Sequence, residues 1–240
     1  MQATEVAKID GQVICYNAQI LSQISPQFFD LDWHRSRAGV HGSAPGRGHA
    51  HFLHAQGQEL VLRPFRRGGL IGKFNSDLYM RFGFENSRAF REYRLLEWMR
   101  SRGLSVPRPV AARYVPSGLC YRAGLITERI PQARPLADIL LETPLALPIW
   151  SKIGGVIRQM HALGVYHSDL NCRNILLDAD MQVWLIDFDK CRRRRNTGWQ
   201  QQNLSRLRRS LNKEETKHPE LNWSDTEWST LLSGYERDEQ

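Results

Sequence analysis

The chain has 240 residues, of which 41% are hydrophobic, and this composition fits a globular protein and excludes a largely disordered one. Its formal net charge of +8 favours an anionic partner: nucleic acid, an acidic membrane surface or a phosphorylated molecule. No apolar run approaches the ~20 residues of a membrane span, the four cysteines lack C-x-x-C spacing, and the start lacks a signal-peptide pattern. We therefore expect a protein kept inside the cell with reduced thiols.

The first 30 residues are expected to form a leader that packs on the first lobe. Residues 18–24 are compatible with a short helix, because Ser25-Pro26 would end it. An apolar cluster follows and is predicted to pack on the first sheet; it consists of Phe28, Phe29, Leu31 and Trp33.

A glycine-rich segment with Gly46 and Gly48 at its tip precedes a strand predicted at residues 59–64. Glycine lets backbone amides approach phosphates and take positive φ, so we interpret the segment as a phosphate-covering loop, with a plain Gly/Pro-rich turn as the alternative. The nearby histidines (His49, His51 and His54) lack a cysteine or carboxylate to complete a metal site, so we do not favour one there.

The predicted strand carries Arg63, whose guanidinium can fork onto phosphate oxygens, and Lys73 is the alternative cation. A helix is predicted at residues 87–102, because apolar residues recur at helical spacing after a serine N-cap and a glycine follows. Within it, Glu92 is the candidate ion-pair partner of the strand cation.

A strand predicted at residues 119–130 ends at Glu128, where we expect two lobes to join, which makes Glu128 a further candidate nucleotide contact. The small lobe would span residues 31–127 and the larger one residues 128–240. Long helices are predicted at residues 150–163 and 199–212 from their apolar periodicity, the second being rich in arginine.

Between these helices lies the most informative stretch, in which His167-x-Asp169 is followed by Asn174 and then Asp187. The apolar runs at residues 175–177 and 183–186 predict a hairpin that brings the polar side chains together. Phosphoryl transfer needs such a set: a carboxylate for the attacking hydroxyl, and oxygen ligands that hold Mg²⁺ against the phosphates of ATP. We assign Asp169 to the hydroxyl and Asn174 and Asp187 to the metal. His167 would brace the loop by hydrogen bonding.

Four consecutive arginines follow Asp187: Arg192, Arg193, Arg194 and Arg195. They are a candidate surface for phosphates of the acceptor or for a phospholipid membrane, the alternative being a solvated charge run. The arginines are not interleaved with stacking aromatic residues, so no nucleic-acid partner is expected. The sequence does not indicate a protein partner.

The motif H-x-D-L-x-x-x-N with the downstream D-F resembles the catalytic and metal-binding loops of the protein-kinase-like superfamily. Residues 63–73, 87–96 with 106–110, 167–176 and 186–190 further resemble bacterial lipopolysaccharide-core kinases, most closely the 3-deoxy-D-manno-octulosonic acid (Kdo) kinases. The resemblance implies a two-lobed α+β fold and phosphorylation of the 4-hydroxyl of Kdo on a lipid A precursor by ATP and Mg²⁺. It also implies a peripheral position on the cytoplasmic face of the inner membrane, whose anionic surface would be a second partner.

The chain departs from protein kinases in ways that favour a small-molecule or lipid-linked acceptor. Ser168, Asn171 and Asp189 replace an arginine, a lysine and a glycine found in many protein kinases, and no A-P-E segment follows. Two alternatives remain at this stage: another sugar acceptor such as a core heptose, or a nucleotide-binding pseudokinase scaffold, supported only by Arg63 in place of a lysine.

Overall fold

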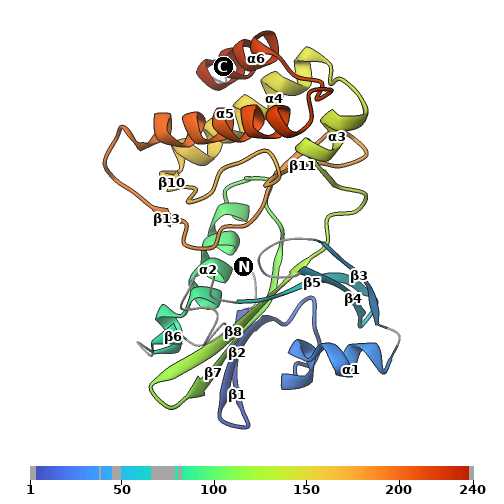
Figure 1. Ribbon diagram of the computed structural model, residues 1–240. Coiled ribbons are helices and arrows are strands. Elements are labelled where there is room, and N and C mark those ends of the chain that lie inside the picture. Colours follow the sequence, from blue (N-terminus) through green and yellow to red (C-terminus); the bar gives the residue numbers. More distant parts are fainter. Residues whose placement is uncertain (1–3, 38, 45–49, 66–78, 81–82, 238–240) are drawn as a thin grey trace. The chain divides into compact units, whose positions relative to one another are not determined.

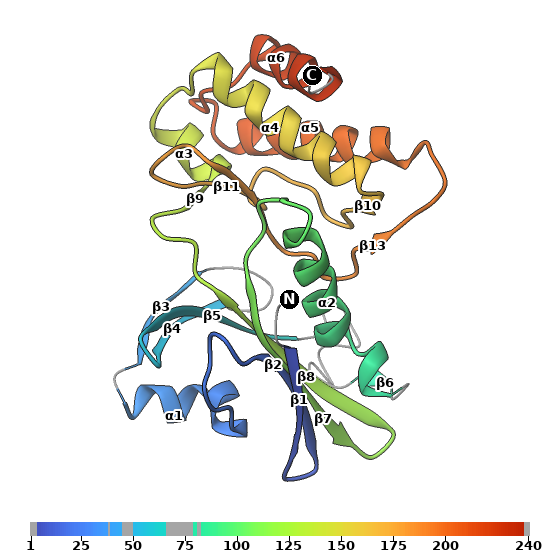
Figure 2. The same ribbon diagram turned by 180° about the vertical axis from the view of Figure 1, so that it is seen from behind.

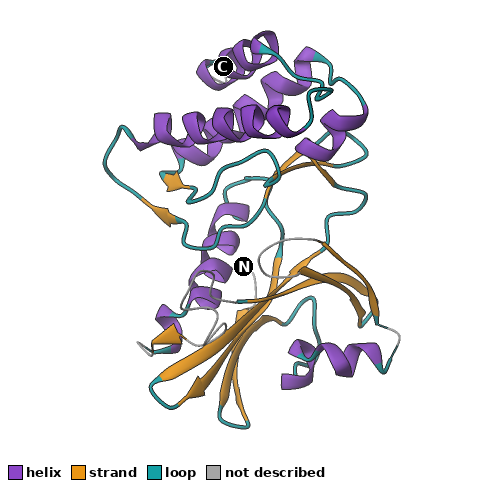
Figure 3. Ribbon diagram, in the orientation of Figure 1, coloured by secondary structure: helices purple, strands orange, loops and turns teal. Residues whose placement is uncertain are grey.

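The computed structural model describes residues 4–37, 39–44, 50–65, 79–80 and 83–237 (Figure 1). It divides into two compact units, one made of Met1–Glu97 and Arg108–Arg129 and the other of Trp98–Pro107 and Ile130–Gln240. The first is built on an antiparallel sheet and the second is mainly helical (Figure 3). The predicted α+β, kinase-like class is thereby confirmed.

The sheet of the first unit has the strand order β1-β2-β7-β8-β5-β4-β3, with β6 paired to β8, and each of its pairings is antiparallel. The strands are β1 (Thr4–Ile9), β2 (Gln12–Asn17), β3 (Val40–Ala44), β4 (Ala50–Ala55), β5 (Gln58–Pro64), β6 (Tyr79–Met80), β7 (Pro109–Ser117) and β8 (Cys120–Glu128). The strands predicted at residues 59–64 and 119–130 are confirmed as β5 and β8.

Short helices accompany this sheet, and the long helix predicted at residues 87–102 is confirmed as α2. The short helices are η1 (Pro26–Phe29), α1 (Leu31–Arg35) and η3 (Phe84–Asn86), and α2 spans Arg88–Arg100. The aromatic residues of η1 are buried in a core cluster with residues of β2, β4, β5, β7 and β8, and Leu31 and Trp33 pack against it. The expected packing of this apolar cluster on the sheet is correct.

The helix considered for residues 18–24 is wrong. The carbonyl oxygen of Asn17 accepts hydrogen bonds from the backbone N–H groups of Ile20 and Leu21, both at 3.1 Å. Its side-chain Oδ1 accepts a third from the backbone N–H of Gln19 at 3.0 Å. Asparagine commonly closes turns through its own side chain. The segment therefore turns once, and Leu21 enters the core with no exposed surface.

The second unit contains four helices in its described part: α3 (Leu136–Glu142), α4 (Leu147–Ala162), α5 (Trp199–Lys217) and α6 (Asp225–Glu236). Its short strands are β9 (Arg134–Pro135), β10 (Val165–Tyr166), β11 (Ile175–Leu177), β12 (Val183–Leu185) and β13 (Arg192–Arg193). The helix predicted at residues 150–163 lies within α4 except for Leu163, and the helix predicted at residues 199–212 lies within α5. The predicted hairpin is formed by β11 and β12.

No helix in the described ranges combines the length and the apolar character needed to cross a membrane.

The second unit depends on close packing of α6 on α4 (Figures 1 and 2). Two glycines make this approach possible. A Cβ atom on Gly154 of α4 would overlap the carbonyl oxygen of Leu231 and lie 2.7 Å from the backbone nitrogen of Tyr235. A Cβ atom on Gly234 of α6 would overlap the backbone of Ser151. The two helix backbones therefore touch where a side chain would hold them apart.

We expect Gly154→Ala to lower the free energy of unfolding by about 3 kcal/mol, because the obstructing atoms belong to a backbone that cannot move aside without separating the helices. Gly155→Ala is the matched control. A Cβ atom there meets nothing within 4 Å, so removal of a helical glycine should stabilise the protein by about 0.5–1 kcal/mol. Urea unfolding of both variants measures the difference, and equal effects would contradict this account of the helix contact.

Candidate active site

The register of the β11–β12 hairpin brings Asn174 and Asp187 to the same end. Ile175 is paired with Leu185, so the residues that precede β11 lie opposite those that follow β12. The backbone N–H of Ile186 donates to the carbonyl oxygen of Asn174 at 3.0 Å, which extends the pairing by one bond. Asp187 follows with φ of +65°, a left-handed conformation that is uncommon for residues other than glycine and is often found at functional sites.

The loop before β11 fixes the orientation of the Asn174 amide. Its Nδ2 donates to the carbonyl oxygen of Asp169 at 2.9 Å, and so does Nδ2 of Asn171. With the nitrogen of the Asn174 amide held by this bond, its Oδ1 is the atom offered to a ligand. The backbone of Asp169 is therefore joined to the first of the two predicted metal ligands.

His167 holds the two loops together. Its ring is fully buried, and Nδ1 accepts a hydrogen bond from the backbone N–H of Asp169 at 3.2 Å, so the proton resides on Nε2, which donates to the carbonyl oxygen of Ile186 at 3.0 Å. Burial lowers the pKa of His167 from its ordinary value, which keeps the ring neutral. The ring also packs on Phe188, with centroids 4.8 Å apart. Through these contacts the His167 ring joins the loop that carries Asp169 to the end of β12.

Asn203 of α5 is a supporting residue that the sequence did not single out. Its Oδ1 accepts from the backbone N–H of His167 at 3.1 Å and its Nδ2 donates to the carbonyl oxygen of His167 at 2.9 Å. The same Oδ1 lies 3.3 Å from Nε2 of His161 on α4, whose Nδ1 lies 2.9 Å from the hydroxyl of Tyr235 on α6. A polar chain, buried except at the half-buried Tyr235, thus joins three helices to the loop that carries Asp169.

The Asp169 carboxylate points away from this buried network, and 58% of its side chain is exposed. One of its oxygens accepts a hydrogen bond from Nη1 of Arg206 on α5 at 3.1 Å. Arg206 was visible in the sequence only as one arginine of a basic helix. The exposed carboxylate is available to a hydroxyl group from outside, which is what the predicted role requires.

In the first unit, Arg63 of β5 forms the expected ion pair with Glu92 of α2, and only 3% of the Glu92 side chain is exposed. Glu128 at the end of β8 pairs with Arg108, their side chains 3.3 Å apart. The other predicted nucleotide contacts (Gly46, Gly48 and Lys73) lie outside the described residues. Nucleotide binding by any of these side chains stays a prediction.

The four arginines that follow Asp187 differ in their surroundings. Arg192 and Arg193 form β13, which pairs with β10, and both are exposed, as is Arg195. The guanidinium of Arg193 lies 4.2 Å from the ring centroid of Trp98, and that of Arg194 lies 3.6 Å from that of Tyr166. Stacking on aromatic rings gives these two a structural contact. Binding of phosphates by the run stays a prediction.

The donor atoms fit magnesium better than a transition metal. No group of three or more His, Cys, Asp or Glu residues in the part of the chain that is described has the arrangement of a metal cage. Mg²⁺ does not need one, because it is usually held by one or two carboxylates together with water and substrate phosphates. Asp187 and the oriented amide oxygen of Asn174 are hard oxygen donors of this kind.

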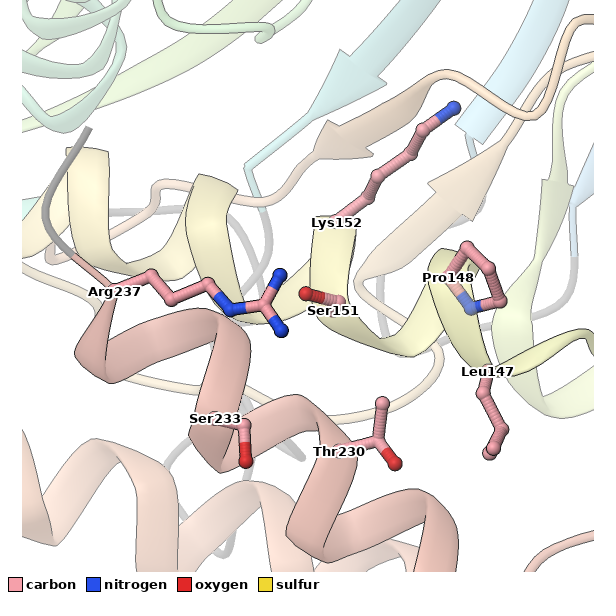
Figure 4. A pocket seen from close by; sticks show the side chains of 7 residues that line it. All are labelled: Leu147, Pro148, Ser151, Lys152, Thr230, Ser233 and Arg237. Atoms are coloured by element: carbon pink, nitrogen blue, oxygen red, sulfur yellow. The ribbon is translucent and has the colours of Figure 1, made fainter. Parts of the chain in front are cut away.

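A separate hollow lies between α4 and α6 and next to Arg237 (Figure 4). Lys152 and Arg237 give it positive charge, and its remaining lining is apolar or hydroxyl-bearing. It contains none of the predicted site residues.

The site is that of a phosphotransferase of the protein-kinase-like class: a loop carboxylate beside an amide and a second carboxylate at the end of a hairpin. The model of the lipopolysaccharide kinase (Kdo/WaaP) family matches residues 31–235, and the chain belongs to this family. The resemblance found in the sequence is confirmed.

Curated relatives match over nearly their whole length. The chain is 44% identical over 221 residues to a 3-deoxy-D-manno-octulosonic acid kinase of Vibrio parahaemolyticus, with 92% of each chain covered. Proteins of the same name from Photobacterium profundum and Haemophilus influenzae are 42% and 37% identical, with 95% and 94% of this chain and 96% and 97% of theirs covered.

We expect Asn203→Leu to lower the free energy of unfolding by about 3 kcal/mol, because it leaves the N–H and C=O of His167 buried without their side-chain partner. Amide hydrogen exchange at His167 should accelerate as well. Gln202→Leu makes the same chemical change at the neighbouring exposed position of α5 and should leave both quantities near the wild-type values. Unchanged exchange at His167 in Asn203→Leu would show that the side chain does not hold the loop.

Burial lowers the pKa of His161 to about 4 from 6.5. As the pH falls through 6.5, the unfolded chain binds a proton that the folded protein does not accept until about pH 4, so stability is lost on acidification over this interval. We expect His161→Gln to remove about 3 kcal/mol of this pH dependence. Urea unfolding from pH 7 to 4.5 measures the difference between variant and wild type, and parallel curves would contradict a neutral, buried His161.

Proposed function

We propose that this chain is a Kdo kinase, which transfers the γ-phosphoryl group of ATP to the 4-hydroxyl of Kdo on a lipid A precursor in lipopolysaccharide inner-core biosynthesis. The observation that carries the proposal is the joining of Asp169, Asn174 and Asp187 by the hydrogen bonds of two loops, in a chain of the lipopolysaccharide kinase family. The shared name of the relatives supports Kdo as the acceptor.

In this mechanism the Asp169 carboxylate orients the acceptor hydroxyl. The hydroxyl oxygen attacks the γ-phosphorus in line with the departing ADP oxygen, so that one O–P bond forms as the other breaks, and the hydroxyl proton passes to Asp169. The exposure of this carboxylate suits a large acceptor, which has to reach it from outside the protein. His167 and Asn203 keep the loop in place without adding charge.

Asn174 and Asp187 would hold Mg²⁺, which when bound neutralises charge on the phosphate oxygens. Arg63, positioned by its ion pair with Glu92, would contact the α- and β-phosphates, with Lys73 as the alternative cation. The segment at Gly46 and Gly48 would cover the phosphates, and Glu128 would lie near the nucleotide.

We also place the protein at the cytoplasmic face of the inner membrane as a peripheral enzyme. The acceptor is anchored in a lipid layer, and the net charge of +8 favours an anionic surface. The exposed guanidinium groups of Arg192 and Arg195, with those of Arg193 and Arg194, follow the metal loop directly and are the candidate contacts for acceptor or lipid phosphates.

The proposal is tested by transfer of labelled phosphate from Mg-ATP to a Kdo-bearing lipid A precursor, with the phosphorylated position assigned by NMR. We expect Asp169→Ala to lower kcat by about 10³-fold, within the range for loss of a catalytic base. Asp180→Ala removes an exposed carboxylate from the β11–β12 turn and should retain wild-type activity.

Activity of Asp169→Ala within about tenfold of wild type would remove Asp169 from the role of base. Wild-type transfer to a heptose-bearing acceptor but not to Kdo would keep the chemistry and replace the acceptor. Binding of ATP with no transfer to either would favour the scaffold alternative.

A further inference from the structure

Arg206 lies on α5 beside the carboxylate that the mechanism uses as a base, and the proposed mechanism gives it no task. Its side chain is 44% exposed and its Nη1 donates to one oxygen of Asp169 at 3.1 Å. An exposed single ion pair of this kind contributes at most about 1 kcal/mol to stability, so structural support does not account for its position.

The other arginines near the loop differ from Arg206. Arg173 joins two carboxylates, Asp138 at 2.9 Å and the largely buried Glu214 at 2.5 Å, and so ties α3 and α5 to the catalytic loop. Arg208 pairs with Asp225 at 2.8 Å and lies over the ring of Trp228. Both are engaged with the body of the second unit. Arg206, by contrast, is paired with a carboxylate that has to bind a substrate.

The position of Arg206 places a cation next to whatever Asp169 binds. A hydroxyl that gives its proton to Asp169 has to come within hydrogen-bonding distance of that carboxylate. The same carboxylate is bonded to Arg206, so the sugar that carries the hydroxyl lies beside the guanidinium. A guanidinium has five donor hydrogens in a planar fork that matches a carboxylate, and the bond to Asp169 uses one of them.

The proposed acceptor supplies the matching anion, because 3-deoxy-D-manno-octulosonic acid, after which the relatives are named, is a sugar acid. On the basis of the proposed function, we propose that Arg206 binds the carboxylate of the Kdo unit that is phosphorylated, and that it thereby selects an acidic sugar as acceptor. Before the acceptor arrives, Arg206 is paired with Asp169. The acceptor carboxylate then takes the guanidinium, and the Asp169 oxygen accepts the hydroxyl proton.

This exchange of partners couples recognition to chemistry. An acceptor without a carboxylate leaves Arg206 on Asp169, where the guanidinium competes with the hydroxyl for the carboxylate. An acidic sugar removes that competition, because its carboxylate takes the guanidinium and leaves the Asp169 carboxylate free to accept the hydroxyl proton. Selection then appears in kcat as well as in KM, because the interaction that positions the sugar also frees the base.

The test compares the wild type and two variants, each with two acceptors that differ only in the carboxylate. Wild type, Arg206→Ala and Arg208→Ala are assayed with the Kdo-bearing precursor and with its Kdo methyl ester, which removes the negative charge and keeps the sugar. We expect the ester to lower kcat/KM of the wild type by about 30–100-fold, as for loss of a charge-assisted hydrogen bond. Arg206→Ala should be slow with both acceptors and distinguish them by less than about threefold.

Arg208→Ala removes the same charge from the opposite side of α5 and should keep the wild-type preference for the acid. Arg206→Lys retains the charge without the fork, and we expect an intermediate preference. An ester penalty that is undiminished in Arg206→Ala and Arg206→Lys would overturn the inference, as would a wild type that does not distinguish the two acceptors. No transfer by the wild type to the acid would instead refute the proposed function itself.

Discussion

The hydrogen bond from Nε2 of His167 to the carbonyl oxygen of Ile186 is the interaction on which the site depends. It joins the loop that carries Asp169 to the strand end that carries Asp187. The same ring accepts from the backbone N–H of Asp169, so one side chain sets the position of both segments. A neutral imidazole has one donor and one acceptor, and here both are used. Protonation would remove the acceptor, and burial opposes protonation by lowering the pKa of the ring.

The side chains that hold the catalytic loop in place are neutral, and the side chains that the site exposes are charged. The neutral side chains are amide, imidazole and phenol groups: the buried Asn203, His161 and His167 and the half-buried Tyr235. A buried ion would cost far more than a buried amide with its hydrogen bonds made. The charges stand at the exposed end, on Asp169 and Arg206. This separation lets the loop be rigid while its carboxylate exchanges partners.

Local patterns in the sequence predicted the part of the site that local structure determines. Asn174 and Asp187 were predicted to meet because two short apolar runs with a polar turn give one hairpin and one register. Asn203 was not predicted, because its partner His167 lies 36 residues away and a polar residue on a helix has no periodic signature of that contact. The helix considered at residues 18–24 is wrong, because the Ser25-Pro26 break marks an end but gives no sign of the turn that Asn17 closes at the start. Arg63 and Glu92 were paired from the order of strand and helix, and the ion pair is present.

The comparison of Arg173 with Arg206 shows why the surroundings of a charge indicate its role better than its exposure. Their side chains are 47% and 44% exposed, and both contact carboxylates on or near the catalytic loop. Arg173 joins Glu214, whose side chain is 9% exposed, to the catalytic loop, so its removal would leave that nearly buried carboxylate with Lys217 as its remaining ion-pair partner. Arg206 neutralises a carboxylate that water reaches and that the reaction requires. The ion pair of Arg206 therefore contributes little to the stability of the fold. The ligand that best matches its guanidinium is a second carboxylate, brought by the acceptor.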